Sequence, residues 1–455
     1  MRVPHSLFKA YDIRRTYPDE INTQTVYAIA RAYATFLTTT HKRDAEAMTV
    51  VVGADARVSS PELFREAARG LSKNGIDVID IGEVSTPIFY FAVRHFRAHG
   101  GVMVTASHNP ANYNGLKLTR EEAIPIGQDS GLHDIKRFAE EEHFSQPENA
   151  GAMRKENIWQ AYVEHTIHDI KITKSLKVVI DAGNGMAGAV VPRILPRFSM
   201  LETTPLFFDI DFTFPNHEAN PIKAKNVAAL RRKVTEINAD IGVAYDGDCD
   251  RVGFVTEEGV TVPGDIITAL IAQELLKKHP RATILYDLRS SRIVKETIEA
   301  YGGRAVETRV GHVFIKKQMR NEDALFAGEL SSHFYYQEEG YVENSDRTML
   351  LILELLSRSG KKLSELVKPL HKYFQSGEIN SKVKDMPTVL RELKKTYRDA
   401  EHYELDGLTV RYPDWWFNVR TSNTEPVIRL NLEANTYNLM AKKRDEVLVL
   451  IRSQK

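Results

Sequence analysis

The chain has 455 residues. That is too long for one hydrophobic core, because cores stop growing near roughly 250–300 residues, so three or four domains are expected. Lys plus Arg and Asp plus Glu both number 61, and this balance gives no global preference for nucleic acid or an anionic membrane. The single cysteine, Cys249, excludes an intramolecular disulfide framework and a cysteine-rich zinc site. With no signal-like or membrane-spanning apolar run, a cytoplasmic protein is expected.

The first three quarters of the chain alternate between apolar β-branched runs and helical patterns. Residues 48–53 are typical of a strand, residues 61–71 of a helix and residues 76–81 of another strand. This alternation predicts βαβ units with a mainly parallel sheet. Three such strands end in an aspartate, and these are Asp55, Asp181 and Asp287. Their wide spacing indicates three related α/β units, although any buried strand leaving a sheet can end in Asp.

The last part of the chain has a different pattern. A long helix over 387–397 is followed by strands over 408–411 and 427–432 and by a terminal helix to residue 451. The predicted fold is therefore α/β, with three related mixed α/β domains and a smaller C-terminal α+β domain. The predicted domains are 1–150, 151–255, 256–367 and 368–455, and each of them carries one polar loop.

The first chemically informative loop is Thr105-Ala106-Ser107-His108-Asn109-Pro110, between strand patterns at 101–105 and 114–118. Ser107 offers a hydroxyl nucleophile on a turn, and His108 and Lys117 are close enough in sequence to polarise a phosphate or move a proton. The alternative is plain turn chemistry, since Ser, Asn and Pro all favour turns. No Gly-x-Ser-x-Gly elbow supports an esterase or protease.

A second loop places Asp246, Asp248 and Asp250 between two strand patterns. If the loop is extended, alternate residues point the same way and the three carboxylates converge on one Mg²⁺, with Cys249 facing away. A calcium EF-hand shares this acid spacing, but Arg251 occupies the position of its turn glycine and the flanks are strands rather than helices. Arg251 is a charge partner of the acids, a clamp for a phosphorylated substrate, or both at once.

Two later loops are candidates for substrate recognition. In residues 328–333, Glu329 and Ser331 are placed to hydrogen-bond neighbouring sugar hydroxyls. The loop at 420–426 combines a cation with hydroxyl donors and a turn-forming Asn, a composition that can wrap a phosphate. Taken alone, the first loop is a weak signal, and the second is also compatible with an ordinary turn at the end of a strand.

Together these loops resemble the active-site loops of the α-D-phosphohexomutases, and within them the phosphomannomutase/phosphoglucomutase group. The resemblance covers nearly the whole chain, from residues 8–14 to the Arg420 loop, and includes residues 53–57, 181–185 and 214–217. It implies four domains around a central cleft. It also implies a reversible transfer of phosphate between O1 and O6 of mannose and/or glucose, through a phosphoserine and a 1,6-bisphosphate intermediate.

The resemblance assigns roles to individual positions of this chain. It implies Mg²⁺ at Ser107, Asp246, Asp248 and Asp250. It implies catalytic roles for Ser107, Arg14, Lys117 and His108. It implies substrate contacts at Arg251, Arg289, His312, Glu329, Ser331, His333, Arg420, Ser422, Asn423 and Thr424. Arg289 stands where relatives commonly carry Lys, so a bidentate clamp replaces a point charge there.

Other functions stay open at this point. They are a phosphoglucosamine mutase, a phosphatase with an aspartate nucleophile, and a non-catalytic protein that binds sugar phosphates. The expected cofactors are Mg²⁺ and a hexose 1,6-bisphosphate activator, and the expected partners are small hexose phosphates, with no nucleic acid and no membrane. The sequence decides neither between monomer and homodimer nor between mannose and glucose, since Glu329 and Ser331 could contact hydroxyls that both sugars share.

Overall fold

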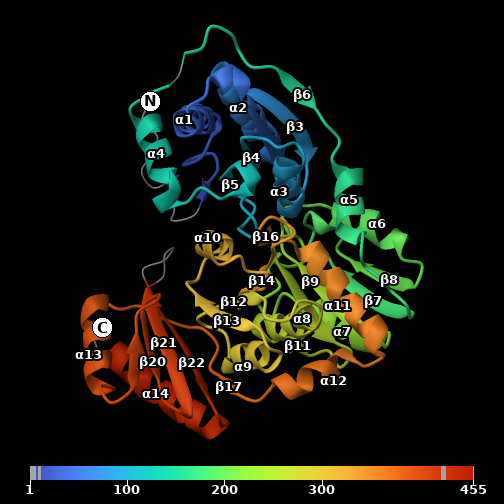
Figure 1. The fold of residues 1–455 in the computed structure, drawn as a ribbon, viewed down its shortest axis with the longest axis vertical. Coiled ribbons are helices and arrows are strands. Elements are labelled where there is room, and N and C mark those ends of the chain that lie inside the picture. Colours follow the sequence, from blue (N-terminus) through green and yellow to red (C-terminus); the bar gives the residue numbers. More distant parts are fainter. Residues whose placement is uncertain (1–6, 9–11, 145, 422–426, 454–455) are drawn as a thin grey trace. The chain divides into compact units, whose positions relative to one another are not determined.

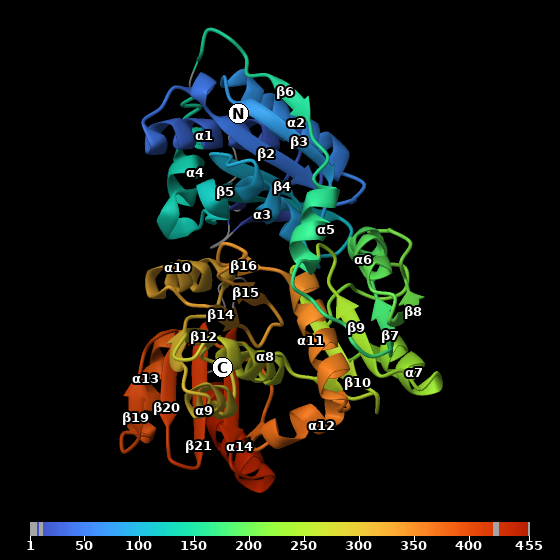
Figure 2. The same cartoon turned by 45° about the vertical axis from the view of Figure 1, so that its right-hand side comes forward.

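The computed structural model of the chain describes residues 7–8, 12–144, 146–421 and 427–453. The chain forms two compact units, each built from two stretches of sequence. Unit 1 comprises residues 1–263 and 331–364, and unit 2 comprises residues 264–330 and 365–455. Figures 1 and 2 show the elements of each unit in two views.

Unit 1 begins with a six-stranded sheet that has helices on both faces (Figure 1). Its strands in spatial order are β1 (Ile13–Thr16), β5 (Tyr113–Arg120), β4 (Gly100–Val104), β2 (Thr49–Ala54), β3 (Asp77–Glu83) and β6 (Met153–Lys155). Its helices are α1 (Thr23–His41), α2 (Ser60–Lys73), α3 (Thr86–His95) and α4 (Leu132–Glu140). β2 pairs in parallel with β3 and β4, whereas β5 runs antiparallel to both of its neighbours.

Successive side chains of a strand point to opposite faces of the sheet, and different helices pack on each face. Val50 and Val52 share one buried core with α1, α2 and α4. On the opposite face Gly101 of β4 lies against α3, where an added Cβ would be 2.6 Å from Phe89 and Val93. This close approach packs the middle of α3 against the start of β4.

The second sheet of unit 1 carries the acidic loop. Its strands in spatial order are β11 (Thr261–Val262), β10 (Val252–Thr256), β9 (Ile241–Tyr245), β7 (Leu176–Asp181) and β8 (Leu201–Leu206). The helices of this part are α5 (Trp159–Ile167), α6 (Ala187–Ile194) and α7 (Ala228–Glu236). β9 and β10 form an antiparallel hairpin beside the parallel pair β7 and β9. The later stretch of unit 1 adds the hairpin of β15 (Phe334–Tyr336) and β16 (Val342–Glu343) and helix α11 (Ser345–Ser359).

Unit 2 combines a parallel α/β part with an antiparallel C-terminal sheet. The first part contains β12 (Thr283–Asp287), β13 (Arg304–Thr308), β14 (Phe326–Gly328), α8 (Gly264–Lys278), α9 (Arg292–Ala300) and α10 (His312–Glu322). α12 (Leu363–Val367) leads from unit 1 into the second part. That part contains β17 (Phe374–Gln375), β18 (Ile379–Ser381), β19 (Glu401–Tyr403), β20 (Leu408–Arg411), β21 (Trp415–Thr421), β22 (Ile428–Ala434), α13 (Met386–Thr396) and α14 (Tyr437–Arg452). Its strand order is β17-β22-β21-β20-β19, with β18 on β22.

The predicted fold class is confirmed, with three α/β parts followed by a smaller α+β part. The three strand-ending aspartates share one turn chemistry, because each carboxylate accepts the N–H of the second residue after it. These contacts are Asp55 with Arg57 (3.1 Å), Asp181 with Gly183 (2.9 Å) and Asp287 with Arg289 (2.8 Å).

The domain limits at residues 150, 255 and 367 stay predictions. Within the described ranges no helix is both long enough and apolar enough to span a membrane.

Candidate functional site

The serine loop connects β4 to β5 in unit 1. Ser107 is buried, with 2% of its surface exposed, and has a left-handed backbone (φ 51°). Its N–H donates to Thr105 Oγ1 at 2.9 Å, which closes the start of the turn. The hydroxyl oxygen lies 3.1 Å from Asp246 Oδ2 and 3.0 Å from His108 Nδ1. The predicted nucleophile is therefore in contact with the acidic loop, which is 139 residues later in the chain.

Arg57 ties this loop to the sheet below it. Its guanidinium is fully buried and its Nε lies 3.1 Å from Asp55 Oδ2. The two terminal nitrogens donate to four backbone carbonyls of the loop: Ser107 (2.7 Å), Asn109 (2.8 Å), Pro110 (2.8 Å) and Tyr113 (3.1 Å). All five N–H donors of the side chain are thus directed at fixed acceptors. One residue therefore holds the backbone of the loop from Ser107 to Tyr113.

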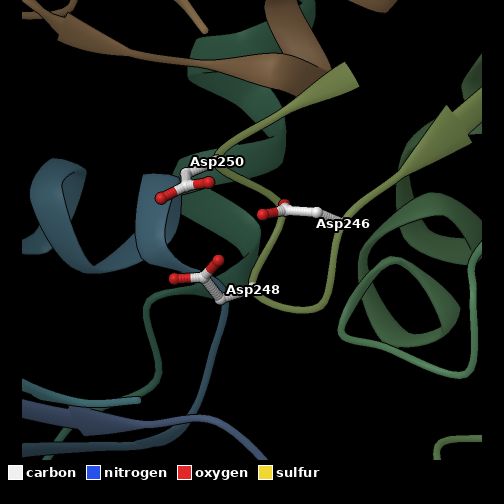
Figure 3. A group of neighbouring side chains, drawn as sticks. All are labelled: Asp246, Asp248 and Asp250. Atoms are coloured by element: carbon white, nitrogen blue, oxygen red, sulfur yellow. The ribbon is translucent and has the colours of Figure 1, made fainter. Parts of the chain in front are cut away.

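The three aspartates lie in the β9–β10 connection and converge, as Figure 3 shows. Their ligand oxygens are within 4.8 Å of one another and all three side chains are buried. The prediction of an extended loop was wrong. The connection is a tight turn in which the Cys249 N–H donates to the Asp246 carbonyl and Cys249 itself has a φ of 61°. The acids converge because the backbone folds back, and Cys249 is buried.

Glycine allows the two loops to pack against each other. A Cβ on Gly247 would lie 2.6 Å from the Ser107 carbonyl oxygen, and one on Gly185 would lie 2.7 Å from the Gly247 carbonyl oxygen. Both contacts would be with backbone, which cannot rotate away. The Met186 N–H also donates to Gly247 O at 2.9 Å. The acidic loop is therefore enclosed by backbone on two sides.

Lys117 of β5 supplies a positive charge inside the acidic group. Its Nζ lies 2.6 Å from Asp250 Oδ2 and 3.0 Å from Asp248 Oδ2. Burial opposes its charge, but these two carboxylates outweigh burial and raise the pKa of Lys117 well above its usual value. Burial likewise opposes the charge of Asp250, yet Lys117 and His333 hold its pKa well below the usual range.

The pKa of Asp246 shifts in the opposite direction to that of Asp250. Burial, together with the charges of Asp250 and Asp248, raises its pKa well above the usual value. A divalent cation reverses this effect, because its charge favours the ionised carboxylate. Asp248 Oδ1 is also buried without a hydrogen-bond donor among the described residues. Three converging carboxylates with such an oxygen fit a hard cation such as Mg²⁺.

Arg14 contacts the serine loop, and His108 is part of it. Arg14, on β1, donates to Asn109 Oδ1 at 2.8 Å and to Asp12 Oδ2 at 2.6 Å. Burial opposes its charge, but nearby acids, Asp12 first, raise the pKa of Arg14. Burial and the positive charges of Arg251 and Arg14 lower the pKa of His108 well below its usual value. The predicted catalytic residues are thus all placed around Ser107 in unit 1.

Three of the predicted substrate residues also belong to unit 1. Arg251 Nε lies 3.2 Å from His333 Nε2, and the Arg251 N–H donates to Asp246 Oδ1 at 3.1 Å. His333 Nε2 is 3.4 Å from Asp250 Oδ1, and its Nδ1 is 3.1 Å from Ser331 Oγ. Ser331 and His333 are therefore connected to the acidic loop through one imidazole ring.

The remaining described substrate residues are in unit 2. Arg289 forms a bidentate contact with Asp287, with Nη2 at 2.7 Å from Oδ2. Glu329, 4.0 Å from Arg289 Nη2, accepts the Gly311 N–H at 3.1 Å, directly before His312 at the start of α10. The structure thus brings Arg289, Glu329 and the first turn of α10 together.

Glu378 connects Arg289 to Arg420 within unit 2. Its carboxylate lies 3.0 Å from Arg420 Nη2, 3.0 Å from Arg429 Nη1 and 3.5 Å from Arg289 Nη1. Burial opposes the charge of Glu378, but the three guanidinium groups lower its pKa. Arg420 itself is 3% exposed. The other predicted phosphate ligands, Ser422, Asn423 and Thr424, lie outside the described residues.

Sequence reasoning assigned no role to three residues that the structure connects to the site: Arg57, Thr86 and Glu378. Arg57 lies in the 53–57 motif, so the signal for it was present in the resemblance. Thr86 and Glu378 carried no local signal, because each acts on a residue more than 40 positions away in sequence.

Comparison with known proteins identifies the family of the chain. Models of the phosphoglucomutase/phosphomannomutase family match the chain in sequence order. Its alpha/beta/alpha domains I, II and III match residues 5–146, 160–259 and 263–373, and its C-terminal domain matches residues 378–449.

Relatives match over the full length. A phosphomannomutase of Escherichia coli is 39% identical over 458 residues, which cover 98% of this chain and 99% of the relative. The phosphohexose mutases of Xanthomonas campestris pv. campestris are 39% identical over 451 residues, with 98% and 99% coverage. A crystal structure of a phosphoglucomutase/phosphomannomutase family protein from Burkholderia thailandensis superposes with a TM-score of 0.91 at 32% identity, covering 99% of this chain and 98% of that one.

The fold, the acidic triad and these relatives define a phosphohexomutase, an isomerase that acts on hexose phosphates. The predicted enzyme class is confirmed. Within that class the chain belongs to the phosphoglucomutase/phosphomannomutase family.

Proposed function

We propose that this phosphohexomutase moves a phosphoryl group between O1 and O6 of a hexose through phosphorylated Ser107. The observation that carries the proposal is the contact of Ser107 Oγ with Asp246 Oδ2 at 3.1 Å, within a buried group of three carboxylates. A serine hydroxyl beside a site for a divalent cation is suited to phosphoryl transfer, which depends mainly on positioning and charge stabilisation.

In the forward step the phosphorus–Oγ bond of phosphorylated Ser107 breaks as a bond to the free sugar hydroxyl forms. The sugar hydroxyl loses its proton to the protein, and the product is a hexose 1,6-bisphosphate. In the return step Ser107 Oγ attacks the other phosphate and transfers its own proton to a base. The bond between that phosphorus and its sugar oxygen breaks, and the sugar oxygen takes back a proton from the protein to become a hydroxyl. His108 is placed for that role, with Nδ1 3.0 Å from Oγ.

The cations around the serine loop have a second role in the proposal. Lys117 and Arg14 lie beside the acidic residues and keep their positive charge. They would balance the charge of the phosphoryl oxygens as the transfer proceeds. Asp246, Asp248 and Asp250, together with an oxygen on Ser107, would hold Mg²⁺. When bound, that ion supplies Lewis-acid stabilisation of the phosphoryl group.

Sugar and phosphate recognition is proposed for the residues of the later loops. Glu329 and Ser331 would bind sugar hydroxyls, while His312 and His333 would contact the same ligand. Arg251, Arg289 and Arg420 would bind phosphate, together with Ser422, Asn423 and Thr424. Support comes from the buried guanidinium groups of Arg289 and Arg420, which share Glu378. Arginine is the side chain best suited to bidentate recognition of phosphate.

The proposed substrates are mannose and glucose phosphates. The names of the relatives from Escherichia coli and Xanthomonas campestris support hexose phosphates, with mannose among them. A hexose 1,6-bisphosphate would act as activator by loading Ser107. The four predicted domains, with limits at 150, 255 and 367, are part of the same proposal, and the limits of the family matches support them.

The first test replaces the proposed nucleophile. Ser107→Ala should lower kcat more than about 1,000-fold, because removal of a nucleophile removes the covalent step. Incubation with glucose 1,6-bisphosphate should add one phosphate to the wild-type chain by intact-mass analysis and none to the variant. A coupled assay with mannose 1-phosphate, glucose 1-phosphate and glucosamine 1-phosphate then defines the sugar. Near-normal turnover by the variant would exclude a covalent role for Ser107.

A further inference from the structure

Helix α3 begins directly against the acidic loop. Its first residue, Thr86, makes two hydrogen bonds to Asp248. The Thr86 N–H donates to the Asp248 carbonyl at 2.9 Å, and Thr86 Oγ1 donates to Asp248 Oδ2 at 2.6 Å. Both residues are completely buried. The first N–H groups of a helix have no partner within the helix, and the Asp248 carbonyl accepts one of them. The same contact holds the backbone of Asp248 at the start of α3.

The two carboxylate oxygens of Asp248 have different surroundings. Oδ2 accepts from Thr86 and also lies 3.0 Å from Lys117 Nζ and 3.4 Å from Thr105 Oγ1. Oδ1 is buried and, within the part of the chain that the structure describes, has no hydrogen-bond donor. One oxygen therefore has three donors around it, while the other retains its lone pairs for a different ligand.

Rotation of the carboxylate would exchange these roles. The last torsion of an aspartate is broad, so packing or hydrogen bonding must fix it. The Thr105 contact is long, and Lys117 divides its ammonium group between Asp248 and Asp250. Thr86 makes the shortest of these contacts to Oδ2, and it does so from a β-branched side chain with a stiff first torsion. Its backbone is anchored to the same residue.

We propose that Thr86 is a positioning residue for the metal, which holds Asp248 so that Oδ1 is the oxygen presented to the cation. The inference rests on the proposed metal site of the acidic loop. Residues that hydrogen-bond a metal ligand orient it, and their loss typically costs 10–100-fold in metal affinity. The positive end of the α3 dipole adds to the effect, because it favours ionised carboxylates at the start of the helix.

The test measures metal binding by the full chain, with Mn²⁺ as a spectroscopic probe and Mg²⁺ as its competitor. Thr86→Val keeps the shape but removes the hydroxyl, and its Kd for Mn²⁺ should rise about 10–100-fold. Thr86→Ser keeps the donor and should stay within about threefold of the wild type. The Mg²⁺ concentration for half-maximal activity should rise in parallel in Thr86→Val.

Thr35→Val provides the matched control. Thr35 is a buried helical threonine of unit 1 whose hydroxyl donates to the Arg31 carbonyl at 3.1 Å. Its replacement should leave the Mn²⁺ affinity unchanged, whatever it costs in thermal stability. A loss shared equally by this variant and Thr86→Val would overturn the inference, because it would reflect general destabilisation.

Two further outcomes separate this inference from the proposed function. If Asp248→Asn weakens Mn²⁺ binding and Thr86→Val does not, the role of Thr86 is wrong and the metal site stands. If Asp248→Asn does not change Mn²⁺ affinity, the metal site itself is wrong, and the inference fails with it. Equal losses in Thr86→Val and Thr86→Ser would also contradict it, since Ser retains the hydroxyl.

Discussion

At the scale of single residues, the serine loop depends on Arg57. One buried guanidinium is bonded to Asp55 and to four loop carbonyls. Lysine has the same charge but lacks the planar fork that reaches several acceptors at once. The position of Ser107 Oγ relative to Asp246 therefore depends on the shape of the Arg57 side chain more than on its charge.

Arg57→Lys should lower kcat about 100-fold, because a displacement of the nucleophile by about 1 Å is enough for a loss of this size. KM for the sugar phosphate should change little, since no proposed sugar contact is bonded to Arg57. Steady-state kinetics with added bisphosphate would measure both values.

Arg69→Lys is the control for this substitution, since Arg69 is an exposed arginine of unit 1 that pairs with Glu66. Its kinetics should stay at the wild-type level. Retention of wild-type kcat in Arg57→Lys would contradict the positioning role.

At the scale of elements, the start of α11 contains a buried acid that the proposed chemistry does not use. Asn344 caps the helix by accepting the Arg347 N–H at 2.9 Å. Asp346, two residues later, accepts the Tyr162 hydroxyl at 2.7 Å. Burial raises the pKa of Asp346 to about 6, although hydrogen bonds from Tyr162 and Tyr245 oppose the shift. The folded protein therefore holds this proton more tightly than the unfolded chain does.

The sign of the pH effect follows from linkage. An acid with a raised folded pKa stabilises the fold most below its ordinary pKa of 3.8, and this contribution is lost as the pH rises through about 6. The loss is about 3 kcal/mol of unfolding free energy. Asp346→Asn should therefore lose less stability than the wild type between pH 4 and pH 7, as measured by urea unfolding followed by circular dichroism.

Asp134→Asn, at an exposed position of α4, should keep the wild-type slope. Parallel pH profiles for the wild type and Asp346→Asn would show that Asp346 is not the source of the effect.

Helices and strands could be predicted where the pattern of apolar residues is local in sequence. The strand over 408–411 and the helix over 387–397 have apolar patterns that need no distant partner, and both form as β20 and α13. The acidic loop was found from its spacing alone. Its shape was not, because the turn depends on Gly247 packing against Ser107. Contacts such as Thr86 with Asp248 join positions 162 residues apart, and no local pattern specifies them.

At the scale of the whole molecule, the proposed roles are divided between the two compact units. Ser107 and the three aspartates belong to unit 1, whereas Arg289, Glu329 and Arg420 belong to unit 2. Metal binding and the phosphate contacts proposed for Arg289 and Arg420 should therefore be separable by mutation, whereas Arg251 belongs to unit 1.

Arg420→Ala should raise KM for the sugar phosphate about 10–100-fold, the effect of losing one charged hydrogen bond, and leave Mn²⁺ affinity unchanged. Asp248→Asn should instead lower Mn²⁺ affinity at least about 10-fold. Paramagnetic resonance titrations and steady-state kinetics on both variants test the separation. A change of Mn²⁺ affinity in Arg420→Ala would show that the two functions are coupled.

Unit 1 is not continuous in sequence, since residues 331–364 complete it after the first part of unit 2 has been made. During synthesis a ribosome releases the serine loop and the acidic loop long before His333, which lies 3.4 Å from Asp250. Domains fold largely from the N-terminus as they are made. Asp250 is therefore without His333 while the next 83 residues (333 − 250) are translated. Unit 1 is complete only when the segment that contains α11 has left the ribosome.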